Sequence, residues 1–171
     1  AVMCEAFRAG HDIHTATAAR VYGVGIDEVT KDMRRKAKAV NFGIIYGMTA
    51  FGLAERIGIS RTEASEVIKS YFKEYVGIQE YINNIKEFAR SHGYVETMFG
   101  RRRYLHDINT SNSVVRAFAE RNAVNAPIQG SSADMIKLAM SRIFNEMNAL
   151  GMRSKMILQV HDELVFDAVL D

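Results

Sequence analysis

Four residues in the stretch RRKAKAVNFGIIYG, residues 34–47, combine charge and aromatic character at a regular spacing. Arg34, Lys38, Phe42 and Tyr46 follow one another every four positions. Side chains four apart share one face of an α-helix, and at about 1.5 Å per residue this row would be roughly 18 Å long. Arginine and lysine bind phosphate oxygens, and an aromatic ring can lie against a sugar or a base. The row therefore has the order of groups that a nucleoside triphosphate would require.

A second interpretation of the same row is structural. Apolar residues at helical spacing usually mark the buried face of a helix, so Phe42 and Tyr46 would belong to a core while the cations form a solvated face. The cations lie in the first half of the predicted helix, where positive charge opposes the helix dipole. An anionic ligand would relieve this conflict, which favours the binding interpretation without excluding the other.

Another group with a spacing of four consists of Arg121, Asn125 and Gln129. Guanidinium and amide groups can donate hydrogen bonds to the acceptors that every base pair presents in the minor groove of a duplex. Pro127 lies inside this row, and we expect it to interrupt the helix that carries the three residues. An ordinary exposed polar face is the alternative.

Two predicted hairpin turns are rich in charge of opposite sign. Arg101–Arg103 follow Gly100, and this basic turn suits either contacts to a phosphate backbone or structural ion pairs. The other turn lies in QVHDELVF, residues 159–166, whose apolar residues we expect to bury both strands and to hold Asp162 and Glu163 rigidly. Carboxylates at strand ends can bind the divalent metal ions used in phosphoryl transfer. Adjacent strand residues face opposite ways, however, and a solvated acidic turn would show the same pattern.

The composition is that of an ordinary globular protein. The 171 residues are 48% hydrophobic and 25% charged, which suffices for one domain with a core or for part of a larger one. No apolar run reaches the roughly 20 residues that span a bilayer, so no membrane partner is expected. The single cysteine, Cys4, excludes an internal disulfide. A net charge of +2 is too small to indicate an anionic partner by itself.

The elements that position these residues form a predominantly helical α+β fold with two hairpins. Cap signals and periodicity predict helices over His14–Tyr22, Arg34–Tyr46 with a cap at Asp27 or Thr30, Ala50–Ile57, Ser60–Phe72, Ile78–His92, Ser113–Asn125 and Ser131–Leu150. Hairpins are predicted around Phe99-Gly100 and His161-Asp162. The first ten residues read like the middle of a helix without a cap, as expected for a segment of a longer chain.

Four segments, in this order, resemble the polymerase domain of DNA polymerase family A, the DNA polymerase I family. They are GHDIH at 10–14, the stretch at 34–47, RNAVNAPIQGSSAD at 121–134 and QVHDE at 159–163. The resemblance covers essentially the whole chain and implies part of a right-hand polymerase fold. Residues 1–92 would be the fingers subdomain with an N-terminal remnant of the palm, and residues 93–171 would be palm. The thumb and the nuclease domains would be absent.

The resemblance also implies an activity and a role for each group of residues. The activity is template-directed DNA synthesis in replication and repair, by transfer of a nucleotide from dNTP to the primer 3′-OH. The intact enzyme would be monomeric, bacterial in type, cytoplasmic and associated with the nucleoid. The dNTP would contact His14, Arg34, Lys38, Phe42 and Tyr46. The primer–template DNA would contact Arg121, Asn125, Gln129 and His161. Lys38 would be the general acid for the pyrophosphate leaving group, Asp162 would bind Mg²⁺ in a two-ion site, and Glu163 would support catalysis.

The sequence departs from the family pattern at one point. The family's other metal-binding aspartate belongs to an upstream motif such as DYSQIELR, which these 171 residues lack, so we expect the chain to be inactive alone. Two rival interpretations stay open. One is a fragment of a single-subunit RNA polymerase, which has a related basic helix and His-Asp hairpin, and the other is a non-catalytic DNA-binding module. NFG at 41–43 and NAPIQGSSAD at 125–134 favour the DNA enzyme over the RNA polymerase.

Overall fold

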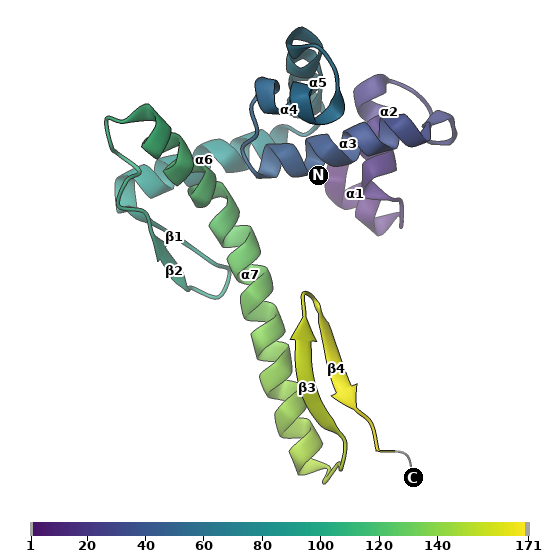
Figure 1. Ribbon diagram of the computed structural model, residues 1–171, viewed down its shortest axis with the longest axis vertical. Helices are drawn as coiled ribbons and strands as arrows, with labels where there is room; N and C mark the ends of the chain where they lie inside the picture. The colour runs from purple at the N-terminus through teal and green to yellow at the C-terminus, as the bar shows by residue number, and fades with distance from the viewer. Residues whose placement is uncertain (1, 170–171) are drawn as a thin grey trace. The chain divides into compact units, whose positions relative to one another are not determined.

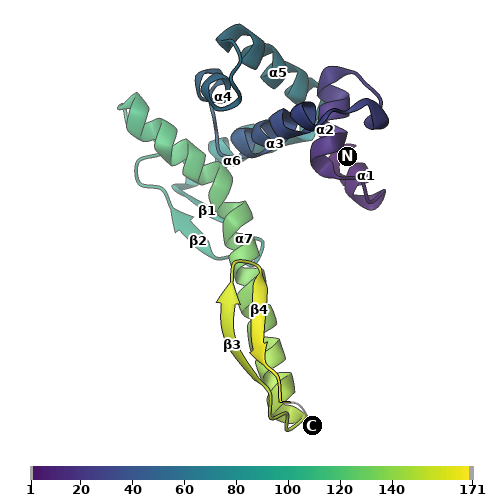
Figure 2. The ribbon, with the colours of Figure 1, turned by 45° about the vertical axis from the view of Figure 1, so that its right-hand side comes forward.

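The chain is mainly helical, with two small two-stranded sheets, in a computed structural model that describes residues 2–169 (Figures 1 and 2). In order, the elements are α1 (Val2–Arg8), α2 (Ile13–Tyr22), a short 3₁₀ helix (Ile26–Glu28), α3 (Lys31–Ile45), α4 (Ala50–Ile57), α5 (Arg61–Glu74), α6 (Val76–His92), β1 (Tyr94–Glu96), β2 (Arg102–Tyr104), α7 (Ser113–Ala149), β3 (Lys155–Val160) and β4 (Glu163–Asp167). None of the helices within residues 2–169 combines the length and the apolar character that crossing a bilayer requires.

The elements form two compact units. The first contains the residues up to Val95 together with Tyr104–Asn125, and the second contains Glu96–Arg103 together with the residues from Ala126 onward. The division into fingers and palm at residues 92 and 93 stays a prediction.

Capping residues set the ends of the helices in the first unit. The side chains of Asp12, Thr30 and Ser60 accept hydrogen bonds from the backbone three residues further on, where α2, α3 and α5 begin. Gly23 and Gly93 end α2 and α6 in the left-handed conformation. The helices expected up to residue 92 are confirmed to within a few residues, and of the two candidate caps for α3 it is Thr30 that serves.

The core of the first unit is built around α3, α4 and α5. Its buried residues are Val40, Ile44, Leu53, Ala54, Ile57, Ala64, Tyr71 and Tyr75. α2 packs along α3, and buried alanines of α2 make this close packing possible. Because α3 turns Ala37, Val40 and Ile44 inward, the residues on its other side are left at the surface.

The prediction of two helices joined at Ala126-Pro127 is wrong, because α7 continues from Ser113 to Ala149 with Pro127 inside it. A proline within a helix costs about 3 kcal/mol, since it lacks the N–H that would bond the carbonyl four residues earlier. Two side chains form hydrogen bonds to backbone carbonyls just before the proline and at the proline itself. The Tyr81 hydroxyl donates to the Val124 carbonyl over 3.0 Å, and the Ser131 hydroxyl donates to the Pro127 carbonyl.

In the second unit, the β3–β4 hairpin pairs antiparallel, with Val160 opposite Glu163 and an irregularity between Met156 and Leu158. The hairpin was predicted, but the expectation that apolar residues bury both strands is wrong. Ile157 and Leu158, for example, are 61% and 55% exposed. The sheet has two strands within the described residues, so its side chains find few partners, and the turn is not clamped by a core.

The turn between β1 and β2 is held against α7 in the same unit. The Met98 amide donates to the Ser131 hydroxyl over 2.9 Å, and Arg101 Nε donates to Asp134 Oδ1 over 2.7 Å. Gly130 allows this close approach, because a Cβ at that position would lie 2.6 Å from the Thr97 methyl group. The β1–β2 turn is therefore anchored to the helix by side chains rather than by strand pairing alone.

Candidate functional site

The predicted row of four residues lies on the solvent side of α3. Arg34, Lys38 and Phe42 project from the helix, and Tyr46 is the residue at its C-terminal cap. Phe42 is 41% exposed and Tyr46 is 45% exposed, so neither ring belongs to the hydrophobic core and the structural interpretation is wrong for both. The two rings are nearly parallel, with centroids 6.4 Å apart. The row thus presents two cations and two stacked rings to solvent.

Acidic residues, rather than a ligand, offset the positive charge at the start of α3. Asp32 lies in the first turn, where a negative charge suits the helix dipole, and it forms ion pairs with Arg35 and Lys36 at 2.7 and 2.9 Å. The sequence-based reasoning that a ligand is needed to relieve the charge therefore does not hold. Among residues 2–169, Lys38 takes part in no ion pair.

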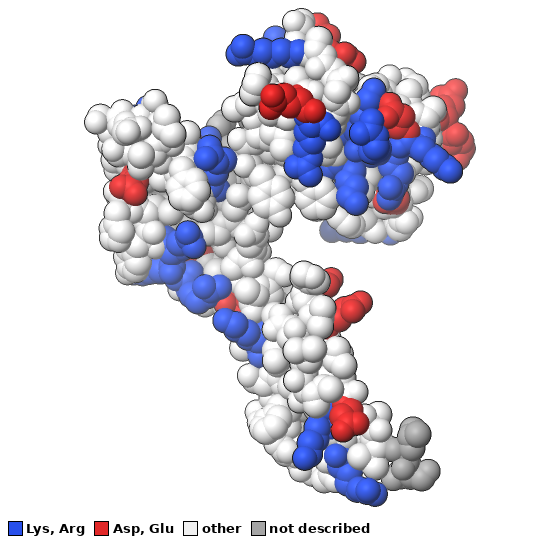
Figure 3. Space-filling model, viewed as in Figure 1, with Lys and Arg blue, Asp and Glu red and all other residues white. Residues whose placement is uncertain are grey.

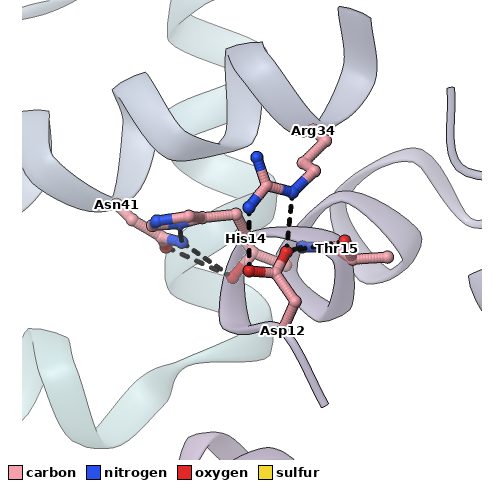
Figure 4. Close-up of polar contacts among 6 residues, drawn as sticks. Asp12, His14, Thr15, Arg34 and Asn41 are labelled. Carbon is pink, nitrogen blue, oxygen red and sulfur yellow. Dashed lines mark hydrogen bonds and ion pairs between the residues drawn. The ribbon is translucent and has the colours of Figure 1, made fainter. Parts of the chain in front are cut away.

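Arg34 is fixed by a carboxylate from the neighbouring helix (Figure 4). Its Nε and Nη2 atoms donate to the two oxygens of Asp12 over 2.9 and 3.0 Å. Asp12 also caps α2 by accepting from the Thr15 amide and hydroxyl. Hydrogen bonds from Arg34, and then from Thr15, hold the pKa of the Asp12 carboxyl well below its usual range. Within residues 2–169, Nη1 of Arg34 has no hydrogen-bond partner and can bind another acceptor.

His14 lies beside the row, as the second residue of α2. Its ring centroid is 5.7 Å from that of Phe42, and its Nδ1 is 3.0 Å from Nδ2 of the buried Asn41 (Figure 4). Burial lowers the pKa of His14; Asp12 opposes this shift, while Arg34 and Lys38 add to it. The structure thus brings together all five residues predicted to contact a nucleotide, on two helices of one unit.

The surface around this row is hollowed on one side. A pocket of about 200 Å³ is lined by Arg35, Lys38, Phe42, Arg56 and two apolar neighbours. Figure 3 shows Lys and Arg side chains gathered over the same group of helices, with acidic residues among them. Arg35 is already paired with Asp32, whereas Lys38 and Arg56 form no ion pair within residues 2–169. These two cations suit an anion, and Arg56 of α4 adds a charge that the spacing in α3 does not reveal.

Arg121 and Asn125 both lie on α7 within the first unit. Arg121 is half-buried, its guanidinium lies 5.7 Å from the Phe118 ring centroid, and its side chain lies close against Gly47, directly after Tyr46. The Oδ1 atom of Asn125 is buried without a hydrogen-bond partner within residues 2–169. Gln129 belongs to the second unit, where it is exposed. The predicted interruption at Pro127 is absent, so the three residues share one continuous helix.

The acidic turn of the second unit borders a pocket. His161 and Asp162 form the turn between β3 and β4, with His161 at a positive φ of 54°. Asp162 lines a pocket of about 440 Å³ together with Gln129, Gln159, His161 and small or apolar residues of α7. Asp162 and Glu163 are both exposed. Residues 2–169 contain no group of three His, Cys, Asp or Glu side chains that could hold a metal ion, so Asp162 offers one hard oxygen ligand but not a complete site.

Comparison with known proteins identifies the family. A family model described as DNA polymerase family A matches residues 1–171. The chain belongs to DNA polymerase family A. This result confirms the predicted family and favours the DNA polymerase family over the single-subunit RNA polymerases. The structure confirms the predominantly helical α+β fold.

The family A relatives are longer than this chain. DNA polymerase I of Caldicellulosiruptor bescii is 51% identical over 166 residues, which cover 97% of this chain and 20% of that protein. DNA polymerase I of Lactococcus lactis is 50% identical over 170 residues, which cover 99% and 19% respectively. The chain thus spans about a fifth of the length of these curated relatives. A solved structure, described as the POL domain of Pol1 from M. smegmatis in complex with DNA primer-template and dNTP, matches with a TM-score of 0.93 and 46% identity, covering 98% of this chain and 30% of that one.

The other charged turn of this family A chain is engaged in structural ion pairs. Arg101 binds Asp134 at 2.7 Å and Arg102 binds Glu96 at 2.7 Å. Of the two interpretations of the basic turn, the structure supports ion pairing for these two arginines.

Sequence reasoning missed three residues beside the predicted nucleotide contacts. Asp12 carries a detectable signal, because Asp before a helical run is a typical N-cap, but its pairing with Arg34 spans 22 positions. Asn41 sits in the quoted NFG triplet, yet nothing in the spacing predicts its contact with His14. Arg56 has no sequence signal at all.

Proposed function

We propose that the chain is the dNTP-binding part of an enzyme that carries out template-directed DNA synthesis in replication and repair. The reaction transfers a nucleotide from dNTP to the primer 3′-OH. The observation that supports it best is the exposed row of Arg34, Lys38, Phe42 and Tyr46 with His14 beside it. If these four side chains were buried, they could not contact a nucleotide, and the role that the family resemblance implies for them would have no surface.

Within this proposal, the triphosphate binds the cationic half of the row. Nη1 of Arg34 and the ammonium of Lys38 contact phosphate oxygens, and His14 contributes a further hydrogen bond. Lys38, which has no competing carboxylate within the described residues, protonates the pyrophosphate as it leaves. Arg34 remains paired with Asp12, so it acts mainly as a positioned donor and Lys38 as the net charge.

The aromatic half of the row contacts the rest of the nucleotide. Phe42 packs against the sugar, and Tyr46 closes over the new base pair. Their stacked arrangement gives a continuous apolar surface that a sugar and a base can cover. Arg121, Asn125, Gln129 and His161 contact the primer–template DNA. The side-chain amide of Gln129, which is exposed, can donate a hydrogen bond to the acceptors of a minor groove.

We further propose that Asp162 binds a divalent metal ion, Mg²⁺, with Glu163 in a supporting role. Asp162 is an exposed carboxylate at a strand turn, the hard oxygen ligand that Mg²⁺ prefers. The described residues do not complete a site, so the proposal takes at least one further carboxylate from outside them, in keeping with the upstream aspartate that the family resemblance implies. When bound, two such ions would stabilise the attacking and leaving oxygens, an arrangement already established for polymerases. The intact enzyme is proposed to act as a monomer in the bacterial cytoplasm, at the nucleoid.

Single-nucleotide incorporation by the full-length polymerase tests the proposal. Lys38→Ala should lower the rate of incorporation about a hundredfold or more, as expected for loss of a general acid, while duplex DNA binding stays within about twofold. Lys69→Ala, at an exposed lysine of α5, is the matched control and should change neither value. An equal loss of DNA binding and of incorporation in Lys38→Ala would contradict the assigned role and favour a DNA-binding module.

The isolated 171-residue chain provides a second test. With Mg²⁺, all four dNTPs and a primer–template, it should show no extension, because Asp162 alone cannot hold two metal ions. Robust extension by the purified chain would refute the proposed dependence on a carboxylate outside it.

A further inference from the structure

A chain of buried hydrogen bonds runs behind His14. Asn41 Nδ2 lies 3.0 Å from His14 Nδ1, the Thr17 hydroxyl lies 3.2 Å from Asn41 Oδ1, and the Tyr75 hydroxyl lies 3.1 Å from that of Thr17. Thr17, Asn41 and Tyr75 are 0%, 7% and 4% exposed. The chain joins α2, α3 and the junction of α5 with α6. Polar groups in such a setting must be paired with each other, because water does not reach them.

The direction of donation along this chain follows from its buried end. Within residues 2–169 the Tyr75 hydroxyl has one side-chain hydrogen-bond partner, Thr17, and leaving its hydrogen unpaired would cost about 1–3 kcal/mol. Tyr75 therefore donates to Thr17, and Thr17 donates to Asn41 Oδ1. Nδ2 of Asn41 carries two hydrogens: it can donate one to the Thr17 hydroxyl oxygen, 3.1 Å away, and it donates the other to His14 Nδ1. That nitrogen must carry a lone pair, so the ring proton sits on Nε2.

We infer that Asn41 is a positioning residue that holds His14 as the neutral imidazole with its proton on Nε2, so that His14 offers the triphosphate a hydrogen-bond donor. Nε2 has no partner within the described residues and is free to serve. The inference rests on the proposed contact between His14 and the triphosphate. It goes further, because it assigns the protonation form of His14 and names the side chains that set it.

The surroundings of His14 favour the same form. The charged groups that face it are Asp12 on its own helix and Arg34 and Lys38 on α3. Burial is the largest influence and lowers the pKa of His14, and the two cations add to this effect. The pairing of Asp12 with Arg34 leaves Lys38 as the uncompensated charge nearby. His14 therefore offers the phosphate oxygens a directed hydrogen bond, and Lys38 offers them a positive charge.

Asn41→Asp is the sharpest perturbation, because it keeps the shape of the side chain and reverses its hydrogen bonding. A carboxylate only accepts, so His14 Nδ1 must take the proton. The neutral ring then turns a lone pair toward the phosphates, and the Nε2 donor returns only when acid makes the ring a cation. In the full-length polymerase, the dNTP Kd of this variant should match wild type within about threefold at pH 6 and be about tenfold weaker at pH 9. The dNTP Kd of the variant is divided by that of wild type at each pH, so that any pH dependence common to both proteins cancels.

Three further variants make the result decisive. Asn84→Asp adds the same charge at an exposed position of α6 and should show a flat ratio across the pH range. Tyr75→Phe removes the donor that sets the direction and should weaken dNTP binding about threefold. His14→Gln carries an amide donor near the place of Nε2 at every pH, so neither Asn41→Asp nor Tyr75→Phe should have an effect on top of it.

Two outcomes would overturn the inference and leave Asn41 with a packing role. One is a Kd ratio for Asn41→Asp that does not change with pH. The other is that Asn41→Asp weakens dNTP binding equally whether residue 14 is His or Gln. Unfolding midpoints of the variants show whether packing has suffered. His14→Ala separates this outcome from failure of the proposed function. If His14→Ala leaves the dNTP Kd unchanged, the contact between His14 and the triphosphate is wrong. If it weakens binding about tenfold while Asn41→Asp is flat, only the role of Asn41 is wrong.

Discussion

Asp12 performs two tasks that can be separated by substitution, since it caps α2 and binds Arg34. Asp12→Asn keeps a good N-cap but removes the charge, whereas Asp12→Ala removes both. Loss of an N-cap costs about 1 kcal/mol. The side chains of Arg34 and Asp12 are 47% and 41% exposed, so solvent screening makes the ion pair a smaller contribution than the cap. We therefore expect α2 to lose about 1 kcal/mol more stability in Asp12→Ala than in Asp12→Asn.

Hydrogen exchange of the full-length protein measures these losses locally. Peptides that cover Ile13–Tyr22 should exchange slightly faster in Asp12→Asn than in wild type. They should exchange about fivefold faster again in Asp12→Ala, because 1.4 kcal/mol corresponds to a factor of ten. Peptides of α5 should be unchanged. Equal acceleration in both variants would refute the division of roles, because it would make the ion pair, and not the cap, the larger contribution.

The pH dependence of the same measurement has a defined sign. The pKa of the Asp12 carboxyl is lower in the folded chain than its ordinary value, because of Arg34 and then Thr15. A group with a lowered folded pKa stabilises the fold above its unfolded pKa, about 4, and this contribution is lost as the pH falls toward the folded value. The difference between wild type and Asp12→Asn should therefore be constant at neutral pH and shrink below about pH 4.

Three further predictions concern other parts of the chain. Asp162→Asn in the full-length enzyme should abolish nucleotide incorporation while duplex binding, measured by fluorescence anisotropy, stays within about twofold; retained incorporation would remove Asp162 from the metal site. Gly47→Ala should lower the unfolding free energy by at least about 1 kcal/mol. Gly47 has a φ of 66°, and a Cβ there would lie 2.6 Å from Arg121 Cγ. An unchanged urea midpoint of unfolding would contradict this prediction. Arg101→Ala should destabilise the β1–β2 turn more than Arg103→Ala, because Arg101 binds Asp134 of α7, whose side chain is only 12% exposed. Equal hydrogen-exchange rates of the turn in the two variants would show that this ion pair contributes nothing.

Local signals predicted most of the helices of the first unit. Ser60, Thr30 and Gly93 act through hydrogen bonds or backbone angles within three or four residues, so the sequence contains the whole cause of each boundary. The four-residue spacing of the α3 row is local in the same sense. Exposure of Phe42 and Tyr46 was not decided by spacing, because either face of a helix can be turned toward a core that other segments supply.

Two predictions failed because their outcome depends on distant contacts. Pro127 was expected to end a helix, yet α7 continues through it with Tyr81, 43 positions from the carbonyl that it contacts, bonded beside the proline. The β3–β4 strands were expected to be buried because they are apolar. Burial requires partners, and the described residues provide a single hairpin for that sheet.

Asn41 and Phe42 show how one short stretch can both display and fix a binding surface. Adjacent helix residues point about 100° apart, so Phe42 stays at the surface beside His14 while Asn41 turns inward to Thr17, 24 positions away. A substitution at an exposed residue such as Phe42 would leave the contact between Asn41 and Thr17 intact. A substitution of Asn41 would disturb His14 and leave the exposed residues of α3 unchanged. Because the inner contact is made between two helices, its effect depends on how α2 and α3 are held together. Any ligand that tightens the packing of α2 on α3 should therefore also restrict the range of orientations of the His14 ring. The hydrogen bonds of the buried Thr17 and Tyr75 hydroxyls transmit this effect.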